Sequence, residues 1–558
     1  MKKLPYGISN YEELINENYY YVDKSKYIEK LESLPEKRIM FLRPRKFGKT
    51  LFTSMIASYY DKRKKEKFDK LFGETYIGKN PTELRNSYSI LKFNFSGIDT
   101  TDAESTTKGF KNEVASSVNL FTETYGLNFF VNYSDEAENI LNNLFKAFEI
   151  QRENEKIYVI IDEYDHFANE LLGFNTNQFK NLVSKNGKVR KWYEILKKGT
   201  ESVVDRIFIT GVAPLTLDRL TSGFNISSDK TMDGNLNEMM GFTKAEIVEM
   251  LDSQEISKEN QETILPLMKE NYDGYMFSLY GKEKIYNSNM CLYFLKEYAE
   301  YCRIPMQLID MNIASDYTKL GKMLDLCKGE EREKVIEKTV TGEGIISDIT
   351  GKFNPAMEFT EKDLVSMLFY LGYLTIEDEE VGYPKLSIPN RVMKEIYSDY
   401  FLKILKDEMS VGVTENYSEI AREIALEGKI DKIVSVLQNY LENLSNRDYI
   451  KFDEKYVKLI FYCIAMNLKI FRLKSEMEVG RRYPDILLIP RNKEKGYKAV
   501  MIEFKYLKKE NADKLREKEH EAINQLKEYS EIEEIKEIEK LSKYAVIAVG
   551  SEIKVTKV

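Results

Sequence analysis

The sequence has few of the residues that build zinc clusters or disulfide frameworks. It contains four cysteines and two histidines in 558 residues, and no cysteines are paired at metal-ligand spacing. We therefore do not expect a Cys/His zinc site. Unpaired cysteines suit a reducing compartment, so the expected location is the cytoplasm.

Long apolar runs are also missing. The longest lies near 364–376 and is too short to span a bilayer. The first methionine is followed by two lysines, Pro5 and Gly7 rather than by an apolar segment, which argues against a signal peptide. We therefore expect no membrane partner.

A strong positive charge is absent as well. The formal net charge is −8, which argues against a protein that coats nucleic acid with its whole surface. Contact with DNA or RNA would need a local basic patch. Residues 62–67, 185–191 and 508–518 are candidates, although such patterns more often mark a solvated face. The chain is too long for one hydrophobic core, so three or more domains are expected.

One stretch near the N-terminus has the order of elements that a phosphate-binding loop requires. An apolar run at 38–42 predicts a strand, and apolar spacing from 51 to 59 predicts a helix. Between them lies Arg43-Pro-Arg-Lys-Phe-Gly-Lys-Thr50, with Arg43 where the usual pattern has glycine. Backbone N–H groups and a helix N-terminus attract a polyphosphate. The predicted ATP-binding residues of this loop are Arg45, Lys46, Phe47, Gly48, Lys49, Thr50 and Leu51, with Lys49 reaching the β- and γ-phosphates and the Thr50 hydroxyl binding Mg²⁺.

A second apolar run ends in acidic residues. The run at 157–161 is rich in β-branched residues and predicts a central parallel strand, which Asp162 and Glu163 follow. Open α/β sheets bind ligands at such strand ends. We predict that Asp162 holds Mg²⁺, directly or through water, and that Glu163 polarises the attacking water. Alone, the pattern would also fit a solvated acidic turn; together with the loop it favours an ATPase.

Further strands are predicted at 89–95 and 205–212, separated by helical stretches. This alternation predicts a mostly parallel sheet with helices on both faces. Thr210, at the end of the last strand, is a candidate sensor of the γ-phosphate. The expected fold class is therefore α/β and multidomain, with a P-loop NTPase sheet.

The pattern becomes helical beyond residue 240. Thr243 and Glu246 fit a capping box, and the region that follows is predicted to form a helical lid. A helix, two short strands and a second helix between 360 and 400 predict a winged-helix-like region. That shape binds DNA in some proteins and only packs in others. Residues 401–445 are predicted to form a helical linker.

Two predicted strands near the C-terminus each carry an acid. Asp485 precedes one apolar run, and Glu503 and Lys505 lie in another. Because side chains alternate along a strand, Glu503 and Lys505 share a face. Asp485 and Glu503 can share a divalent ion, Mg²⁺ or Mn²⁺, while Lys505 orients water or steadies a phosphate.

Two neighbouring helices are expected to support this second site. Glu454, on the preceding helix, adds an oxygen ligand, and Gln525 lies on the helix that follows. The order Pro-Asp, then Glu-x-Lys, is the pattern of PD-(D/E)XK nucleases and predicts a small α/β domain of the restriction-endonuclease type. Because charged residues make up 31% of the chain, Glu-x-Lys could also arise by accident.

Motifs along nearly the whole chain resemble one family. They are Pro5-Tyr-Gly-Ile8, Tyr21-Val-Asp-Lys-Ser25, the loop 43–50, Ile161-Asp-Glu-Tyr-Asp165, Thr210-Gly-Val212, Tyr272-Asp-Gly-Tyr275, Ile388-Pro-Asn390 and the segment 480–505. Together they resemble bacterial AAA-ATPase-like proteins fused to a C-terminal PD-(D/E)XK nuclease-superfamily domain. An arginine at position 43 is normal in that family. The resemblance implies a P-loop fold and nucleotide binding, and it associates the chain with mobile-element or phage-defence biology.

These patterns divide the chain into four regions. We expect an ATPase core at 1–240, a helical lid at 241–345, a winged-helix-like and linker region at 346–445, and a nuclease-like domain at 446–558. Two function classes remain open: an ATP-driven nuclease acting on DNA or RNA, and an ATPase switch or scaffold whose degenerate nuclease domain only binds a partner. Homo-oligomer formation is a further hypothesis, because many P-loop ATPases complete their site with an arginine from a neighbour.

Overall fold

Four long apolar runs of the N-terminal half form one parallel sheet. The strands are β1 (Arg38–Leu42), β2 (Tyr88–Asn94), β3 (Lys156–Asp162), β4 (Val204–Gly211) and the short β5 (Ser228–Asp229). Their order is β2-β3-β4-β1-β5, and every neighbouring pair is parallel. The burial of nearly every residue of β3 and β4 explains their continuous apolar sequence.

The structure is a computed structural model. It describes residues 2–99, 101–166, 187–214, 227–305, 307–310, 319–324, 330–351, 353, 359–407, 415–444, 453–475, 483–492 and 495–558. These residues fall into two units: Met1–Arg332 with Ile345–Arg391, and Glu333–Gly344 with Val392–Val558. Residues 185–186 of one candidate basic patch and 480–482 of the nuclease pattern lie outside the described residues.

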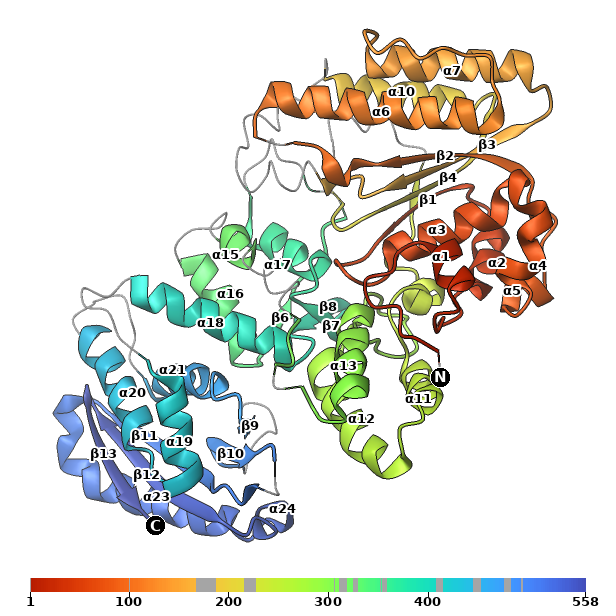
Figure 1. Cartoon of the computed structure of the whole chain (residues 1–558). Helices are drawn as coiled ribbons and strands as arrows, with labels where there is room; N and C mark the ends of the chain where they lie inside the picture. The colour runs from red at the N-terminus through yellow and green to blue at the C-terminus, as the bar shows by residue number, and fades with distance from the viewer. Residues whose placement is uncertain are drawn as a thin grey trace. The chain divides into compact units, whose positions relative to one another are not determined.

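Helices cover both faces of the parallel sheet (Figure 1). One face carries α6 (Ala103–Tyr125), α7 (Ala137–Gln151) and α10 (Lys188–Gly199), and the other carries α3 (Lys49–Tyr60). Trp192 on α10 is fully buried against Phe93 of β2 and against Phe110 of α6, with ring centroids 5.0 and 5.6 Å away. The predicted P-loop NTPase sheet with helices on both faces is confirmed.

The shorter helices of this core lie on the α3 side. They are α1 (Tyr11–Asn16), α2 (Lys26–Ser33), α4 (Phe68–Phe72) and α5 (Tyr76–Lys79), and the 3-10 turn η1 (Lys62–Lys67) contacts α3 and α4. A second 3-10 turn, η2 (Phe95–Gly97), follows β2 and contacts α6. The side chain of Asn10 accepts hydrogen bonds from the backbone N–H groups of Glu12 and Glu13, which fixes where α1 begins.

The region after β5 is mainly helical, as predicted. It contains η3 (Gly234–Met239), α11 (Lys244–Ser253), α12 (Lys258–Tyr272), α13 (Ser288–Tyr301) and α15 (Lys319–Leu324). The expected capping box of Thr243 and Glu246 starts α11. α16 (Glu330–Val340) follows.

A small winged-helix-like element completes the first of the two units. Helix α17 (Glu361–Tyr370) leads into the hairpin of β7 (Thr375–Glu380) and β8 (Tyr383–Ser387), and β6 (Ile345–Ile346) pairs with β8. The exposed end of β7 is entirely acidic, residues 377–380 being Glu-Asp-Glu-Glu. A wing of this charge repels a phosphate backbone.

The C-terminal unit contains a five-stranded mixed sheet. Its order is β13-β12-β11-β10-β9, and only β11 and β12 run parallel. The strands are β9 (Phe471–Lys474), β10 (Ile486–Pro490), β11 (Ala499–Leu507), β12 (Leu541–Val549) and β13 (Glu552–Lys557). This small α/β sheet fits the predicted nuclease-like fold.

Helices pack on this mixed sheet. They include α21 (Glu454–Met466) and α23 (Leu515–Tyr529), and the short η5 (Lys509–Lys514) and α24 (Glu533–Lys536) complete the C-terminal segment. α18 (Arg391–Asp407) precedes α19 (Tyr417–Glu427) and α20 (Asp431–Leu444). The described part of the segment expected as a helical linker therefore packs on the C-terminal sheet and its helices: α19 contacts β11, and α20 contacts α21 and β13.

Candidate functional site

The loop between β1 and α3 has the backbone that phosphate binding needs. Gly48 caps α3 with a φ of +91°, a left-handed conformation that favours glycine. Lys49 begins the helix and is buried, and its Nζ donates to the carbonyl oxygens of Arg43 and Pro44 at 3.1 and 3.0 Å. The loop thus curls around its own lysine, at the N-terminus of a helix.

Arg43 explains why glycine is not needed at the start of the loop. Its buried guanidinium donates to the carbonyl oxygens of Leu42 and Thr231 at 2.9 and 2.8 Å. It stacks between the rings of Phe41 and Phe277, 4.1 and 4.4 Å from their centroids. Burial lowers the pKa of Arg43 to about 9, while Asp229 opposes that shift. Arg43 therefore anchors the loop from behind.

The helical region holds the middle of the loop as well. The ring of Phe47 is 1% exposed and packs edge-on against Tyr275, with centroids 4.9 Å apart. The Phe47 carbonyl accepts from the backbone N–H of Gly241 at 3.1 Å. The Lys46 carbonyl accepts from the Ser288 hydroxyl at 3.1 Å. The loop is consequently braced by residues about 200 positions later in the chain.

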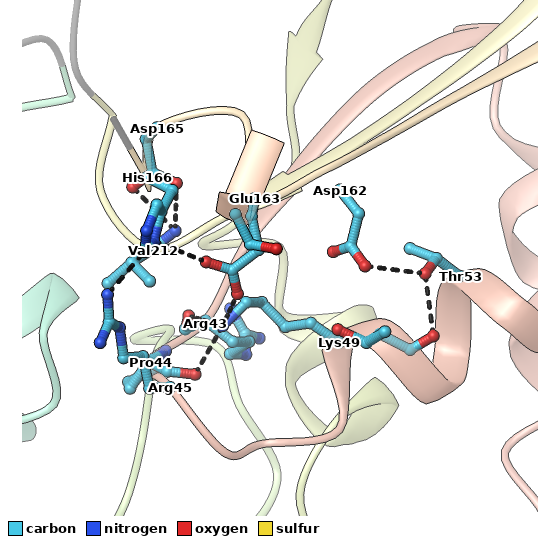
Figure 2. Close-up of polar contacts among 12 residues, drawn as sticks. Arg43, Pro44, Arg45, Lys49, Thr53, Asp162, Glu163, Asp165, His166 and Val212 are labelled. Carbon is cyan, nitrogen blue, oxygen red and sulfur yellow. Dashed lines mark hydrogen bonds and ion pairs between the residues drawn. The ribbon is translucent and has the colours of Figure 1, made fainter. Parts of the chain in front are cut away.

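Acidic groups at the end of β3 face this loop, as Figure 2 shows. Asp162 is fully buried, and its Oδ2 accepts from the Thr53 hydroxyl at 3.4 Å. Its Oδ1 has no hydrogen-bond partner among the described residues, and neither has the buried hydroxyl of Thr210 on β4. Burial raises the pKa of Asp162, while Lys92 and Lys49 oppose that shift. A buried carboxylate oxygen without a partner in the described ranges, on a residue whose raised pKa is opposed in part by a hydrogen bond from the Thr50 side chain, fits an Mg²⁺ ligand.

Glu163 has a different electrostatic setting. Its φ is +55°, which is strained for a non-glycine residue, and Oε1 lies 3.9 Å from Lys49 Nζ. Its Oε2 lies 3.7 Å from His166 Nδ1, and that nitrogen lies 3.4 Å from Arg45 Nη2. Burial alone would raise the pKa of Glu163, but His166, Lys49 and Arg45 lower it to about 2. Glu163 is therefore an ionised carboxylate at neutral pH.

Asp165 supports this strand end, a role that the sequence did not reveal. Its buried carboxylate accepts from the backbone N–H groups of Val212 and Ala213, at 3.0 and 2.7 Å for Oδ2. Burial raises the pKa of Asp165, and these backbone hydrogen bonds oppose the shift. Asp165 ties the acidic turn to the end of β4. His166 was also missed, although a histidine beside an acidic strand end was a visible signal.

A cavity of about 510 Å³ is lined by the predicted loop residues Arg45–Leu51 together with Glu163 and His166. The lining also includes the aromatic and apolar residues Tyr20, Tyr21, Val22, Met240, Phe242 and Met250. Asp162 and Thr210 do not line it, since both are fully buried behind the loop. The cavity therefore combines charged and apolar lining residues, as a nucleotide requires.

The second predicted site also comes together. Asp485 Oδ2 accepts from the backbone N–H of Phe504 at 2.7 Å, and Glu503 Oε2 accepts from the backbone N–H of Asp485 at 3.4 Å. Lys505 Nζ lies 3.1 Å from Glu503 Oε1. All three side chains are almost fully buried. The antiparallel pairing of β10 with β11 brings the two acids side by side.

Lys458 is the main group of this site that the sequence did not reveal. Its Nζ lies 2.7 Å from Asp485 Oδ1 and 2.8 Å from Glu454 Oε1. Glu454 and Lys458 are four residues apart on α21, so the helical spacing was a signal that they share a face. The other oxygen of Glu454 accepts from the backbone N–H of Tyr506 at 3.3 Å. The predicted ligand Glu454 therefore lies at the site, with a lysine between it and Asp485.

Two residues of α23 complete the surroundings. Glu521 lies 3.7 Å from Lys505 Nζ, and Gln525 has a buried Oε1 without a partner among the described residues. Burial raises the pKa of both Asp485 and Glu503; Lys458 opposes the shift at Asp485, and the charge of Asp485 adds to the shift at Glu503. Paired buried carboxylates suit a divalent ion, which removes the cost of their shared charge.

The structure does not present a ready-made metal cluster. Within the described ranges, no group of three or more His, Cys, Asp or Glu side chains is arranged to hold an ion. At both sites lysines neutralise part of the acidic charge. In the same ranges, no helix is long and apolar enough to cross a membrane.

Comparisons with known proteins agree with the two halves of this description. Residues 5–221 match the family model described as a predicted AAA-ATPase, and residues 452–558 match that of the PD-(D/E)XK nuclease superfamily. The chain is also similar to an uncharacterized protein in the vnfD 5′ region of Azotobacter chroococcum mcd 1. The two are 23% identical over 427 residues, which cover 74% of this chain and 72% of that protein. The suspected resemblance to both families is confirmed.

Proposed function

We propose that this protein binds and hydrolyses ATP with Mg²⁺ and that its C-terminal domain cleaves nucleic-acid phosphodiesters with Mg²⁺ or Mn²⁺. The observation that supports it most is the convergence of distant residues at each site. Lys49 and Glu163 meet at the first, and Asp485 and Glu503 meet at the second. A match to both family models supports the same pairing of activities.

At the ATP site the loop residues bind the phosphates and α3 directs its N-terminus toward them. Lys49 would exchange its loop carbonyl partners for the β- and γ-phosphates. Asp162 and Thr50 would hold Mg²⁺, which neutralises charge on the phosphates. Glu163, ionised at neutral pH, would accept a hydrogen bond from the attacking water and polarise it. Thr210 would sense the γ-phosphate.

The apolar lining of the cavity suits the nucleotide base. The segment Tyr20–Val22, which precedes the loop in sequence, lines the cavity together with Met240 and Phe242. Tyr21 donates its hydroxyl hydrogen to the sulfur of Met55 at 2.9 Å, so its ring is held in one orientation. We propose that this segment packs against adenine.

At the nuclease site Asp485 and Glu503 would hold the divalent ion, while Glu454, the further oxygen ligand expected from the sequence, lies beside them in contact with Lys458. The ion supplies an activated water and stabilises negative charge on the phosphate. Lys505 adds a fixed positive charge on the same face of β11. Gln525 would help to orient these groups through its buried Oε1, which has no hydrogen-bond partner among the residues that the structure describes.

The nucleic acid would not be held by the wing. Residues 377–380 place four exposed carboxylates on β7, which would repel a phosphate backbone. We propose that DNA or RNA contacts the C-terminal unit instead, where exposed Lys508, Lys509, Lys514 and Arg516 follow β11 directly. The biological setting that we propose, phage defence or mobile-element biology, rests on the family resemblance alone.

Cleavage assays test the proposal. Wild-type protein should cut plasmid DNA or RNA with Mg²⁺ or Mn²⁺ in the presence or absence of ATP, and Asp485→Ala should not. If the wild type cuts neither substrate under any of these conditions, the nuclease assignment is wrong. The ATPase assignment is tested separately, by measuring ATP hydrolysis.

A second candidate function is an ATPase switch or scaffold with a degenerate nuclease domain. It is favoured by the lysine contacts to Asp485 and Glu503, because ion pairs of this kind can stabilise a domain that has lost its reaction. This candidate predicts nucleic-acid or protein binding without cleavage. A binding screen with DNA and RNA, with and without ATP, separates the two functions.

Self-association is also part of the proposal. Light scattering with and without a non-hydrolysable ATP analogue should show assembly if an arginine of a second copy completes the ATP site. A strict monomer in both conditions would mean that any arginine that completes the ATP site comes from the same chain.

A further inference from the structure

Lys458 takes up a position at the nuclease site that the proposed function does not use. Its ammonium nitrogen lies 2.7 Å from Asp485 Oδ1 and 2.8 Å from Glu454 Oε1. These two acids belong to the predicted ligand set of the divalent ion. Lys458 thus contacts two of three predicted ligands, while Lys505 contacts the third, Glu503.

The ion pair of Lys458 is strong because one partner is buried. The Asp485 side chain is 2% exposed and that of Lys458 is 17% exposed, so solvent screens their attraction little. Glu454 lies one helical turn before Lys458 on α21, and its Oε1 also contacts the ammonium, at 2.8 Å. The rigid helix therefore keeps this positive charge between two carboxylates.

A charge in this position competes with a bound cation. Three carboxylates, Glu454, Asp485 and Glu503, are offset by two ammonium groups. A divalent ion that used both Glu454 and Asp485 would have to displace Lys458. An ion that used Asp485 and Glu503 would leave Lys458 in place but would feel its repulsion.

From this arrangement we propose that Lys458 stands in for a cation between Glu454 and Asp485. It excludes Glu454 from the ligand set, so the site takes one divalent ion through Asp485 and Glu503 and binds it weakly until nucleic acid adds its own phosphate oxygens. Lys458 is a positioning residue, and this inference rests on the proposed metal site.

Metal affinity tests the inference without any activity assay. Mn²⁺ is titrated calorimetrically into the full-length protein without nucleotide or nucleic acid, and the heat measured with Asp485→Ala is subtracted as the background. Lys458→Met removes the charge and keeps the length of the side chain. We expect Mn²⁺ to bind about tenfold more tightly to this variant, because the repulsion by Lys458 is gone and Glu454 becomes available as a ligand. A gain of about threefold is the smallest that would support the inference.

Three further variants separate competition from a merely structural role. Lys458→Arg keeps the charge and should bind Mn²⁺ like the wild type. Lys455→Met is the matched control, because Lys455 lies on the same helix but pairs with Glu337 and Glu343 instead. Adding Glu454→Gln to Lys458→Met should remove most of the gain in affinity. Lys458→Gln replaces the methionine variant if that protein does not fold.

The outcomes distinguish this inference from the proposed function. Affinity that is unchanged, or weaker, in Lys458→Met would overturn the inference, since a lysine that only orients Asp485 would weaken binding when lost. If the wild type binds Mn²⁺ at this site and the variant binds no better, the metal site stands and the role of Lys458 is wrong. If only the variant binds Mn²⁺ and the wild type cuts nothing, the nuclease proposal fails and the role of Lys458 stands.

Discussion

The two sites use the same residue types in opposite electrostatic states. Glu163 lies near His166, Lys49 and Arg45, which lower the pKa of its carboxyl to about 2. Glu503 lies beside a second carboxylate in a drier setting, and its pKa is raised. Its side chain is 3% exposed, against 19% for Glu163. The ATP site therefore contains a base, Glu163, that is ionised before any ligand binds. The nuclease site becomes fully ionised only when a cation binds to its two carboxylates.

The sites also differ in how they are braced. The phosphate loop is anchored by Arg43 and Phe47 to residues far along the chain, so its shape depends on the helical region. The nuclease acids are held by the pairing of β10 with β11 and by direct ion pairs, Asp485 with Lys458 and Glu503 with Lys505. Loop anchoring and local charge pairing therefore respond to different substitutions.

The largest expected effect is that of Lys49→Ala. The lysine is buried at the centre of the loop, so its loss removes the charge that binds the β- and γ-phosphates. We expect ATP hydrolysis to fall by about a thousandfold, as for the loss of a transition-state donor. Lys67→Ala, an exposed lysine of the same unit, is the control. Unchanged nucleotide binding and hydrolysis in Lys49→Ala would contradict the assignment of the ATP site.

Glu163→Gln should separate binding from chemistry. The amide cannot polarise water as a carboxylate does, but Asp162 and the loop remain. We expect kcat to fall by about a hundredfold with ATP affinity retained. Turnover and fluorescent-nucleotide binding measured on one preparation check this, and a normal kcat would remove Glu163 from its role.

The opposite pKa shifts of Glu163 and Glu503 predict that the two sites respond differently to pH. Below its raised pKa, Glu503 carries a proton that competes with the metal, so Mn²⁺ affinity should rise with pH by about tenfold per unit where one proton is displaced. Glu163 stays ionised throughout, so ATP hydrolysis should not gain from the same change. Mn²⁺ titrations and ATPase assays from about pH 5.5 to about pH 7.5 check this, because the pKa of Asp485 is raised to about 6 and that of Glu503 to about 7. A rise of Mn²⁺ affinity and of ATP hydrolysis together would contradict the prediction.

The smallest effect on catalysis is expected from Phe47→Ala. The change opens a cavity beside Tyr275 and should destabilise the protein by about 3 kcal/mol. A looser loop should raise KM for ATP severalfold and change kcat less. Phe130→Ala is the control, because that ring is 89% exposed. Equal KM values for both variants would show that the anchor does not shape the loop.

Much of the fold could be predicted because the signals were local. The run 157–161 and its acidic end lie in one short segment, and the structure places β3 there with Asp162 as its last residue. Thr243 and Glu246 cap α11 for the same reason. Patterns of this kind depend only on neighbours in sequence.

The remaining features depend on residues that are far apart. Arg43 could not be assigned an anchoring role, because Thr231 and Phe277 lie almost 190 or more positions later. Lys458 was hidden among the many charged residues, and only the fold brings it to Asp485. The shape of the wing was predicted, but its acidic charge, visible in sequence at 377–380, was not used.

The central claim is that one chain carries two chemical centres that share no residues. The most direct measurement takes Glu503→Ala and records both activities on the same preparation, namely metal-dependent cleavage of DNA and RNA and hydrolysis of ATP. The account predicts that cleavage is lost and that ATP hydrolysis stays within about twofold of the wild type, a change below 0.5 kcal/mol. Normal cleavage by Glu503→Ala, or loss of both activities in a folded protein, would contradict it.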